Sequence, residues 1–196
     1  MAILKREDIE KMGFASIGQN VNISDRASFY NTSNISLGND VRIDDFCVFS
    51  AGTGGIYIGN YVHIAIGCSL IGAGKITIAD FSTLSSRVAV YSSNDDYSGA
   101  KMTNPTVPSQ YTGVIHANVF LDRHVIVGSG SVILPGITLE CGVAVGALSL
   151  VTKNCKEFGI YAGNPAQRIK ERKRDFLELA RQLLASKGYT ERQDNI

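Results

Sequence analysis

Aliphatic residues recur at every sixth position over much of the chain, a period that fits neither an α-helix nor a half-buried strand. Between residues 127 and 153 they stand at Val127, Ile133, Leu139, Val145 and Val151. A helix face would show apolar spacings of three and four, and a strand would alternate in twos. The fifth place of each block is small or β-branched, and the second is often glycine or acidic. Such blocks are typical of short strands separated by tight corners.

The same block repeats in triplets, each of which starts twenty or twenty-one residues after the last in the first half of the chain. The apolar positions of these triplets are Ile17, Ile23 and Phe29; Leu37, Ile43 and Phe49; Ile58, Ile64 and Leu70; and Ile78, Leu84 and Val90. Three strands with a few extra corner residues close one triangular turn, and only the stacking of turns buries the apolar columns. The pattern predicts a parallel β-helix of about six turns, roughly 30 Å long.

The fold class is therefore all-β, with additions at both ends and in the middle. A short N-terminal helix is predicted over residues 1–14 and the β-helix domain over 15–163, with a long loop at 92–117 that interrupts it. A C-terminal α-helix is predicted over 164–188 and a flexible tail over 189–196. Asn164 and Pro165 suit the N-cap and the first position of the C-terminal helix. A loop as long as the interrupting one is usually functional or disordered.

Composition excludes several classes of protein. The net charge is +1, from 19 Lys and Arg against 18 Asp and Glu, so no overall field favours nucleic acid or an anionic membrane. Residues 46–74 lack charged side chains, but they carry the six-residue code, so we expect no membrane span. The N-terminus lacks the apolar region of a secretory signal, which predicts a cytoplasmic protein. Cys47 and Cys68 occupy small fifth places and are expected in the core.

The repeat, the interrupting loop and the segments "AVGALSLVTK" and "AGNPAQRIK" resemble the hexapeptide-repeat acyltransferases. The resemblance is strongest to acetyl-CoA-dependent sugar and xenobiotic O-acetyltransferases such as galactoside acetyltransferase, and it covers roughly residues 15–172. It implies a left-handed coil and a homotrimer with active sites between subunits. It also implies an enzyme that acetylates a sugar, nucleotide-linked or in a glycan, during surface-polysaccharide synthesis.

The resemblance also assigns residues to acetyl-CoA, the co-substrate. Ser129 and Ala147 match positions that contact the pantetheine arm, and Thr152 and Lys153 match positions near the adenosine 3'-phosphate. A lysine suits that phosphate as a point charge. Further charge comes from Arg168 and Lys170, and the alternative interpretation for residues 170–174 is a solvated helix face.

Catalysis needs a base that takes a proton from the acceptor as it attacks the thioester. The family's usual histidine at the start of the loop is replaced here by Asp95. The candidates for the base are His63 and Asp95, with the pKa of Asp95 or Asp96 raised by the charge of the other. Asn94 and Asp96 are assigned to substrate binding. The alternatives are a solvated edge imidazole for His63 and an Asx-type turn for the segment "NDDYSG".

The missing histidine favours an amine acceptor, because a neutral amine is already nucleophilic, but O- and N-acetylation both stay open. Two rival functions also stay open. One is a catalytically inactive scaffold. The other is a zinc enzyme similar to γ-class carbonic anhydrase, which would use the three histidines, His63, His116 and His124. The sequence lacks the histidine spacing of that class, so no metal is expected.

Overall fold

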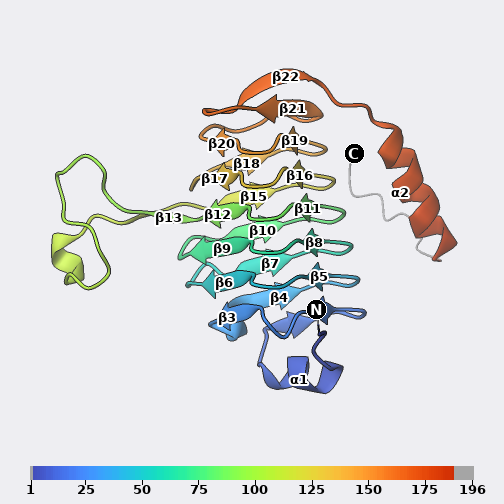
Figure 1. Cartoon of the computed structure of the whole chain (residues 1–196), viewed down its shortest axis with the longest axis horizontal. Helices are drawn as coiled ribbons and strands as arrows, with labels where there is room; N and C mark the ends of the chain where they lie inside the picture. Colours follow the sequence, from blue (N-terminus) through green and yellow to red (C-terminus); the bar gives the residue numbers. More distant parts are fainter. Residues whose placement is uncertain (1, 188–196) are drawn as a thin grey trace.

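The computed structural model describes residues 2–187 and shows a three-sided parallel β-solenoid with a projecting arm and a C-terminal helix (Figure 1). Six complete turns each contribute one strand to each of three sheets, and Cys155 and β21 (Gly159–Ala162) begin a seventh. The predicted parallel β-helix is confirmed, and it is longer than the six turns expected from the pattern.

The three sheets are called the first, second and third face. The first face consists of β1 (Ser16–Ile17), β4 (Ile35–Leu37), β7 (Ile56–Ile58), β10 (Ile76–Ile78), β15 (Val119–Leu121) and β18 (Thr138–Leu139). The second face consists of β2 (Asn22–Ile23), β5 (Arg42–Ile43), β8 (His63–Ile64), β11 (Thr83–Leu84), β16 (Ile126–Val127), β19 (Ala144–Val145), β21 and β22 (Gln167–Glu171). The third face consists of β3 (Ser28–Tyr30), β6 (Val48–Ala51), β9 (Ser69–Gly72), β12 (Ala89–Tyr91), β17 (Val132–Ile133) and β20 (Leu150–Val151).

The apolar residues of the six-residue code stack inside the solenoid in the predicted columns. On the first face the pairs run in register from Ile17 through Leu37, Ile58, Ile78 and Leu121 to Leu139. The last five of these side chains are almost fully buried. Each such side chain contributes roughly 1.5–3 kcal/mol of hydrophobic stabilisation, so the columns hold successive turns together.

The N-terminal end of the columns is covered by a short helix, α1 (Arg6–Lys11). Its Ile9 is buried in the core, and the N–H of the preceding Leu4 donates to the carbonyl oxygen of Ile23. Arg6 donates from Nη1 to the carbonyl oxygen of Gly18, at 2.6 Å. The helix therefore caps an apolar end that would otherwise face water.

The C-terminal helix starts later than the sequence indicated. The helix expected over 164–188 begins at Asp175, as α2 (Asp175–Ser186), and Gln167–Glu171 instead form β22, antiparallel to β21. The last strand of a sheet has unpaired backbone donors and acceptors, and pairing with β22 satisfies them. This strand pairing outweighs the local helix-start signal at Asn164 and Pro165. Gly188 and the tail 189–196 lie outside the described residues.

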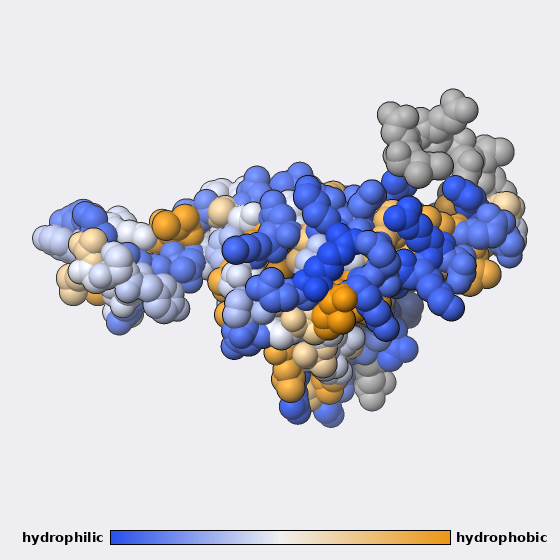
Figure 2. All heavy atoms as spheres, turned by 90° about the horizontal axis from the view of Figure 1, so that it is seen from above, coloured by the Kyte–Doolittle hydropathy of each residue, from blue (hydrophilic) through white to orange (hydrophobic). Residues whose placement is uncertain are grey.

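The interrupting loop forms an arm, residues 92–117, that leaves the corner between the third and first faces. It contains the antiparallel pair β13 (Ser93–Asn94) and β14 (Ile115–His116) and the 3-10 turn η2 (Ser109–Tyr111); a similar turn, η1 (Thr32–Asn34), lies between β3 and β4. Seen along the solenoid from its C-terminal end, the arm and α2 extend to opposite sides (Figure 2). Among residues 2–187, no helix has the length and apolar character needed to cross a membrane.

Candidate active site

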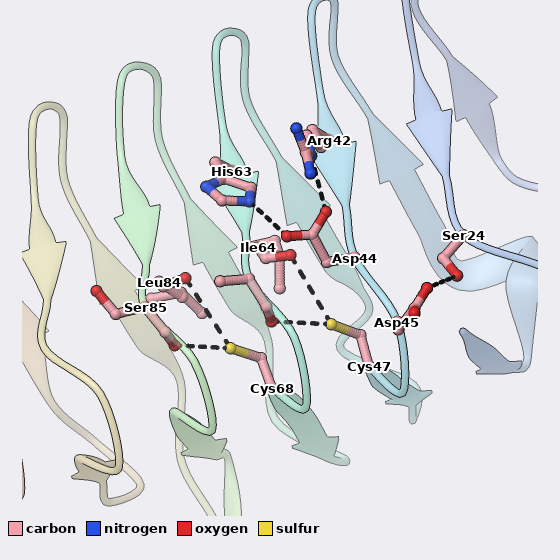
Figure 3. Close-up of polar contacts among 11 residues, drawn as sticks. Ser24, Arg42, Asp44, Asp45, Cys47, His63, Ile64, Cys68, Leu84 and Ser85 are labelled. Atoms are coloured by element: carbon pink, nitrogen blue, oxygen red, sulfur yellow. Dashed lines mark hydrogen bonds and ion pairs between the residues drawn. The ribbon is translucent and has the colours of Figure 1, made fainter. Parts of the chain in front are cut away.

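His63 lies at the start of β8, with its side chain on the outer side of the second face. Its register partners are Arg42 on the preceding turn and Thr83 on the following one. The imidazole Nε2 lies 2.9 Å from Asp44 Oδ2, and Arg42 donates from Nε to Asp44 Oδ1 at 2.7 Å (Figure 3). His63 is therefore one member of an Arg–Asp–His cluster and not an isolated edge imidazole.

The carboxylate of Asp44 is the inner member of this cluster, with 14% of its side chain exposed, against 40% for His63. Burial alone would raise the pKa of Asp44, but the hydrogen bonds and charges of His63 and Arg42 outweigh burial and bring that pKa below its usual value. Asp44 is thus ionised at neutral pH and can only accept hydrogen bonds.

Sequence reasoning missed Arg42 and Asp44. A signal for them exists, because the spacing of 21 residues between Arg42 and His63 equals one turn in this half of the chain. Asp44 follows two residues after Arg42, at the corner that the code predicts. Tracing outward-facing residues along a column, as well as inward-facing ones, would have found the cluster.

The two aspartates of the arm have different surroundings. Asp96 accepts hydrogen bonds from the Ser98 hydroxyl at 2.7 Å, the Ser98 N–H at 3.0 Å and the Lys101 N–H at 2.8 Å. These bonds, that of the Ser98 hydroxyl first, lower the pKa of Asp96. A raised pKa is therefore wrong for Asp96, and the Asx-type turn is the correct interpretation of its carboxylate. Both aspartates are half-buried, so the turn bonds and not burial distinguish Asp96 from Asp95.

Asn94 and His116 sit at the base of the arm. Asn94 pairs with Ile115 in the β13–β14 ladder and is exposed. His116 Nδ1 lies 2.7 Å from Ser93 Oγ, which also accepts the N–H of Ala73 on the solenoid. These contacts tie the arm to the solenoid.

A single chain does not bring His63 and Asp95 together. His63 lies on the second face, whereas the arm is inserted between β12 of the third face and β15 of the first. The packed core of the solenoid separates that corner from the second face. The candidate acid–base residues can share a site only when two chains supply them.

The residues assigned to acetyl-CoA occupy the C-terminal turns. Ser129 and Ala147 are exposed on adjacent turns of the corner between the second and third faces, where the Leu148 N–H donates to the Ser129 carbonyl oxygen at 2.9 Å. Thr152 and Lys153 are exposed just after β20, at the next corner. The two corners flank the third face and could contact the two ends of one extended ligand.

Arg168 and Lys170 are exposed on β22, not on a helix as the sequence indicated. Their register partners on β21 are Tyr161 and Ile160. Arg168 also forms an ion pair with Glu171. Figure 2 shows largely hydrophilic side chains over this end of the solenoid. The structure therefore places these two cations on the second face at its C-terminal end, away from Thr152 and Lys153.

Three of the four cysteines, Cys47, Cys68 and Cys155, are buried in the fold. Cys47 and Cys68 are buried, and their thiols donate to the carbonyl oxygens of Ala65 and Ser85 at 3.1 and 3.0 Å (Figure 3). The hydrogen bond with Cys47 and burial raise the pKa of Cys68, and burial raises that of Cys155 to about 11. No group of three or more potential metal ligands forms among residues 2–187. His63, His116 and His124 lie on a face, the arm and a corner.

Comparison with known proteins places this solenoid in a class. No protein-family model matches the chain. The chain is 55% identical to the dTDP-4-amino-4,6-dideoxy-D-glucose acyltransferase of Escherichia coli over 91% of its length and 93% of the relative's. It superposes with a TM-score of 0.92 on AntD, an N-acyltransferase from Bacillus cereus in complex with dTDP and 3-hydroxybutyryl-CoA. That match is 44% identical and covers 95% of this chain and 98% of AntD.

A variant of AntD has also been solved with dTDP-4-amino-4,6-dideoxyglucose and coenzyme A, and the chain superposes on it with a TM-score of 0.90. That match is 44% identical and covers 94% of this chain and 97% of that one. The fold and these relatives define a β-solenoid acyltransferase. The chain belongs to the hexapeptide-repeat acyltransferase family, as its motifs predicted. The Escherichia coli relative is named as an acyltransferase of an amino sugar and AntD as an N-acyltransferase, and both names agree with the N-acylation branch that the sequence left open.

Proposed function

We propose that the protein transfers an acyl group from acyl-CoA to the amino group of dTDP-4-amino-4,6-dideoxyglucose. The observation that carries this proposal is the 55% identity to an acyltransferase of that name across almost the full length of both chains. The fold of AntD, which binds dTDP and acyl-CoA together, supports it. The replacement of the family's usual histidine by Asp95 also agrees with an amine acceptor.

The chemistry is a direct transfer. The amine nitrogen attacks the thioester carbonyl carbon, the carbon–sulfur bond breaks, and coenzyme A leaves as a thiolate. The nitrogen loses one proton, which a base must accept. His63 and Asp95 are the two proposed catalytic residues, and Asn94 and Asp96 are proposed to position the nucleotide sugar. Asp96 would do so indirectly, by shaping the arm through the hydrogen bonds of its carboxylate.

The proposed acyl-CoA site runs along the C-terminal turns. Ser129 and Ala147 would contact the pantetheine arm, and Thr152 and Lys153 the adenosine 3'-phosphate. Arg168 and Lys170 would add positive charge at the end of the solenoid. The proposed acyl group is acetyl, and 3-hydroxybutyryl is the alternative that the AntD complex suggests.

The separation of His63 from Asp95 within one chain supports a homotrimer with active sites between subunits. The arm carries exposed apolar residues, among them Tyr97, Met102 and Ile115. Such residues favour contact with another protein surface. Because acyl-CoA and nucleotide sugars are metabolites of the cytoplasm, the proposed site of action is cytoplasmic, in the supply of acylated sugars for surface polysaccharides.

The experiment that tests the function measures coenzyme A release with two matched acceptors, the 4-amino nucleotide sugar and its 4-hydroxyl counterpart. Each is combined with acetyl-CoA and 3-hydroxybutyryl-CoA, and product mass identifies the acylated compound. We expect turnover with the amine. Turnover confined to the hydroxyl acceptor would replace N-acylation by O-acylation, and no turnover with either would overturn the proposal.

A further inference from the structure

The Arg42–Asp44–His63 cluster contains more than a candidate base. Both oxygens of the Asp44 carboxylate are engaged, Oδ2 by His63 Nε2 and Oδ1 by Arg42 Nε. Asp44 is less exposed than either of its two partners, because its side chain is 14% exposed against 40% for His63 and 55% for Arg42. The cluster therefore has a fixed inner anion and an outer imidazole.

The hydrogen bonds determine which imidazole nitrogen carries the proton. A carboxylate offers only acceptors, so the nitrogen that faces it must donate, and His63 Nε2 holds a proton. In neutral histidine the other nitrogen, Nδ1, is then unprotonated. In Figure 3 the second ring nitrogen points away from Asp44. Nδ1 is thus the atom that can accept a proton from outside the cluster.

We propose that Asp44 is a positioning residue that fixes His63 in the Nε2–H tautomer and directs Nδ1 toward the acceptor amine, with Arg42 holding Asp44. This inference rests on the proposed function, in which His63 is a catalytic base. The amine nitrogen bonds to the thioester carbon, the carbon–sulfur bond breaks, and the proton passes from nitrogen to His63 Nδ1. His63 later releases it to the thiolate or to water.

Arg42 contributes a permanent charge to this arrangement. Its guanidinium carries a positive charge and donates to the carboxylate oxygen that His63 does not use. The register partner of His63 on the following turn is Thr83, which brings no charge. Within the second face, Asp44 and Arg42 are therefore the charged groups that contact or flank the imidazole.

Kinetics with the 4-amino acceptor separate a positioning role from a structural one. His63→Ala should lower kcat by about 100-fold, the low end for proton transfer, because a neutral amine is already nucleophilic. Asp44→Asn should lower kcat by about tenfold or more with little change in KM, because an amide can favour the wrong tautomer. In the His63→Ala background, Asp44→Asn should cost nothing further, since Asp44 acts only through the imidazole.

The matched control is Asp45→Asn. Asp45 is the next residue on the same corner, but it accepts the hydroxyl of Ser24 and not the imidazole. This variant should keep the wild-type kcat. Equal losses for Asp44→Asn and Asp45→Asn, or additive losses in the double variant, would assign Asp44 a structural role and overturn the proposal.

An independent readout comes from nitrogen-15 NMR, which distinguishes the two imidazole tautomers. The chain has three histidines, so single replacements assign every signal. We expect Nε2–H for His63 in the wild type and its loss in Asp44→Asn. Wild-type His63 in the Nδ1–H form would contradict the proposal even if no acceptor is turned over. Full activity of His63→Ala would also overturn it while leaving acyl transfer intact.

Discussion

The imidazole of His124 lies parallel to the ring of Phe81, with centroids 4.9 Å apart and planes 4° apart. Phe81 in turn stacks on Tyr61 at 4.9 Å, and Phe176 of α2 packs on the imidazole at 5.0 Å. The three stacked rings come from successive turns at the corner between the first and second faces, where each residue has a positive φ. This column attaches α2 to the solenoid.

The column predicts a loss of stability in acid. Burial, followed by the charges of Arg123 and Arg172, lowers the pKa of His124, while Asp80 and Asp122 oppose the shift. The folded state therefore binds the proton more weakly than the unfolded state. The contribution of neutral His124 to the stability of the fold is complete above the pKa of histidine in the unfolded state, about 6.5. It is lost as pH falls through the lower pKa of His124 in the folded state.

The measurement is the thermal midpoint of His124→Phe and of the wild type from about pH 8 to about pH 5. Phenylalanine keeps the ring stack and cannot be protonated, so the variant should lose less stability in this range. His116→Gln, on the arm, is the control and should follow the wild type. An identical acid loss in His124→Phe and the wild type would contradict the role of His124.

A second prediction concerns the corner that carries Ser129 and Ala147. A Cβ added at Gly128 would lie 2.4 Å from the backbone nitrogen of Ala147, closer than real atoms approach. Gly128→Ala should therefore lower the free energy of unfolding by about 1–3 kcal/mol, the usual cost of overpacking. Chemical denaturation measures it, and exposed Ser129→Ala should leave stability nearly unchanged. An equally small effect of both substitutions would contradict the prediction, because it would show that the backbone of the corner moves to accommodate the added Cβ at little cost.

The third prediction tests the phosphate contact of Lys153. Lys153→Gln should raise the KM for acyl-CoA by about tenfold, the loss of one partly exposed charge-assisted contact, without lowering kcat. The same variant should show no such rise with the dephospho-CoA thioester, which lacks the 3'-phosphate. Lys156→Gln is the control, because Lys156 already pairs with Glu140 at 2.7 Å. An equal rise with both thioesters would remove Lys153 from the phosphate site.

The fourth prediction separates the two aspartates of the arm. Asp96 holds a turn through three hydrogen bonds, so Asp96→Ala should loosen the arm and raise the KM for the nucleotide sugar while changing kcat little. Asp95→Ala should instead lower kcat, by about tenfold or more if Asp95 takes part in proton transfer. Steady-state kinetics with both substrates varied give the two constants. The reverse assignment of effects would make Asp96 the catalytic member.

The six-residue code was sufficient for the fold because it specifies the core directly. Ile17, Leu37 and Ile58 are equivalent positions on successive turns, and the structure pairs them in that register. The predicted helix start at Asn164 was wrong because the following segment pairs as β22 with the open edge of β21. The residues near Asn164 contain no local signal for this long-range pairing. Local propensity is a weak guide where a sheet edge needs a partner.

The candidate site was less accessible to sequence reasoning. The contact between His63 and Asp44 joins neighbouring turns. It follows from the 21-residue spacing that puts Arg42 in register with His63, because Asp44 lies two residues after Arg42, although only inward-facing positions had been traced. His63 and Asp95, in contrast, make no contact within one chain, because the two residues lie on different sides of the solenoid. Their relation depends on the geometry of an assembly, which no period within the chain encodes.

That relation gives the last prediction. If each active site takes His63 from one subunit and Asp95 from its neighbour, His63→Ala and Asp95→Ala should complement each other in mixed oligomers. A site is intact when a subunit with native His63 meets a neighbour with native Asp95. With equal amounts and random assembly each condition holds for half of the subunits, so about a quarter of the wild-type activity should return.

The two variants are purified separately, unfolded together and refolded, and coenzyme A release is compared with that of each variant refolded alone. Refolded wild type sets the full activity, and the double variant His63→Ala, Asp95→Ala mixed with wild type controls for dilution. Light scattering of the refolded protein tests for the proposed trimer. No recovery from a well-folded mixed oligomer would mean that His63 and Asp95 do not act across an interface, and the intersubunit site would have to be abandoned.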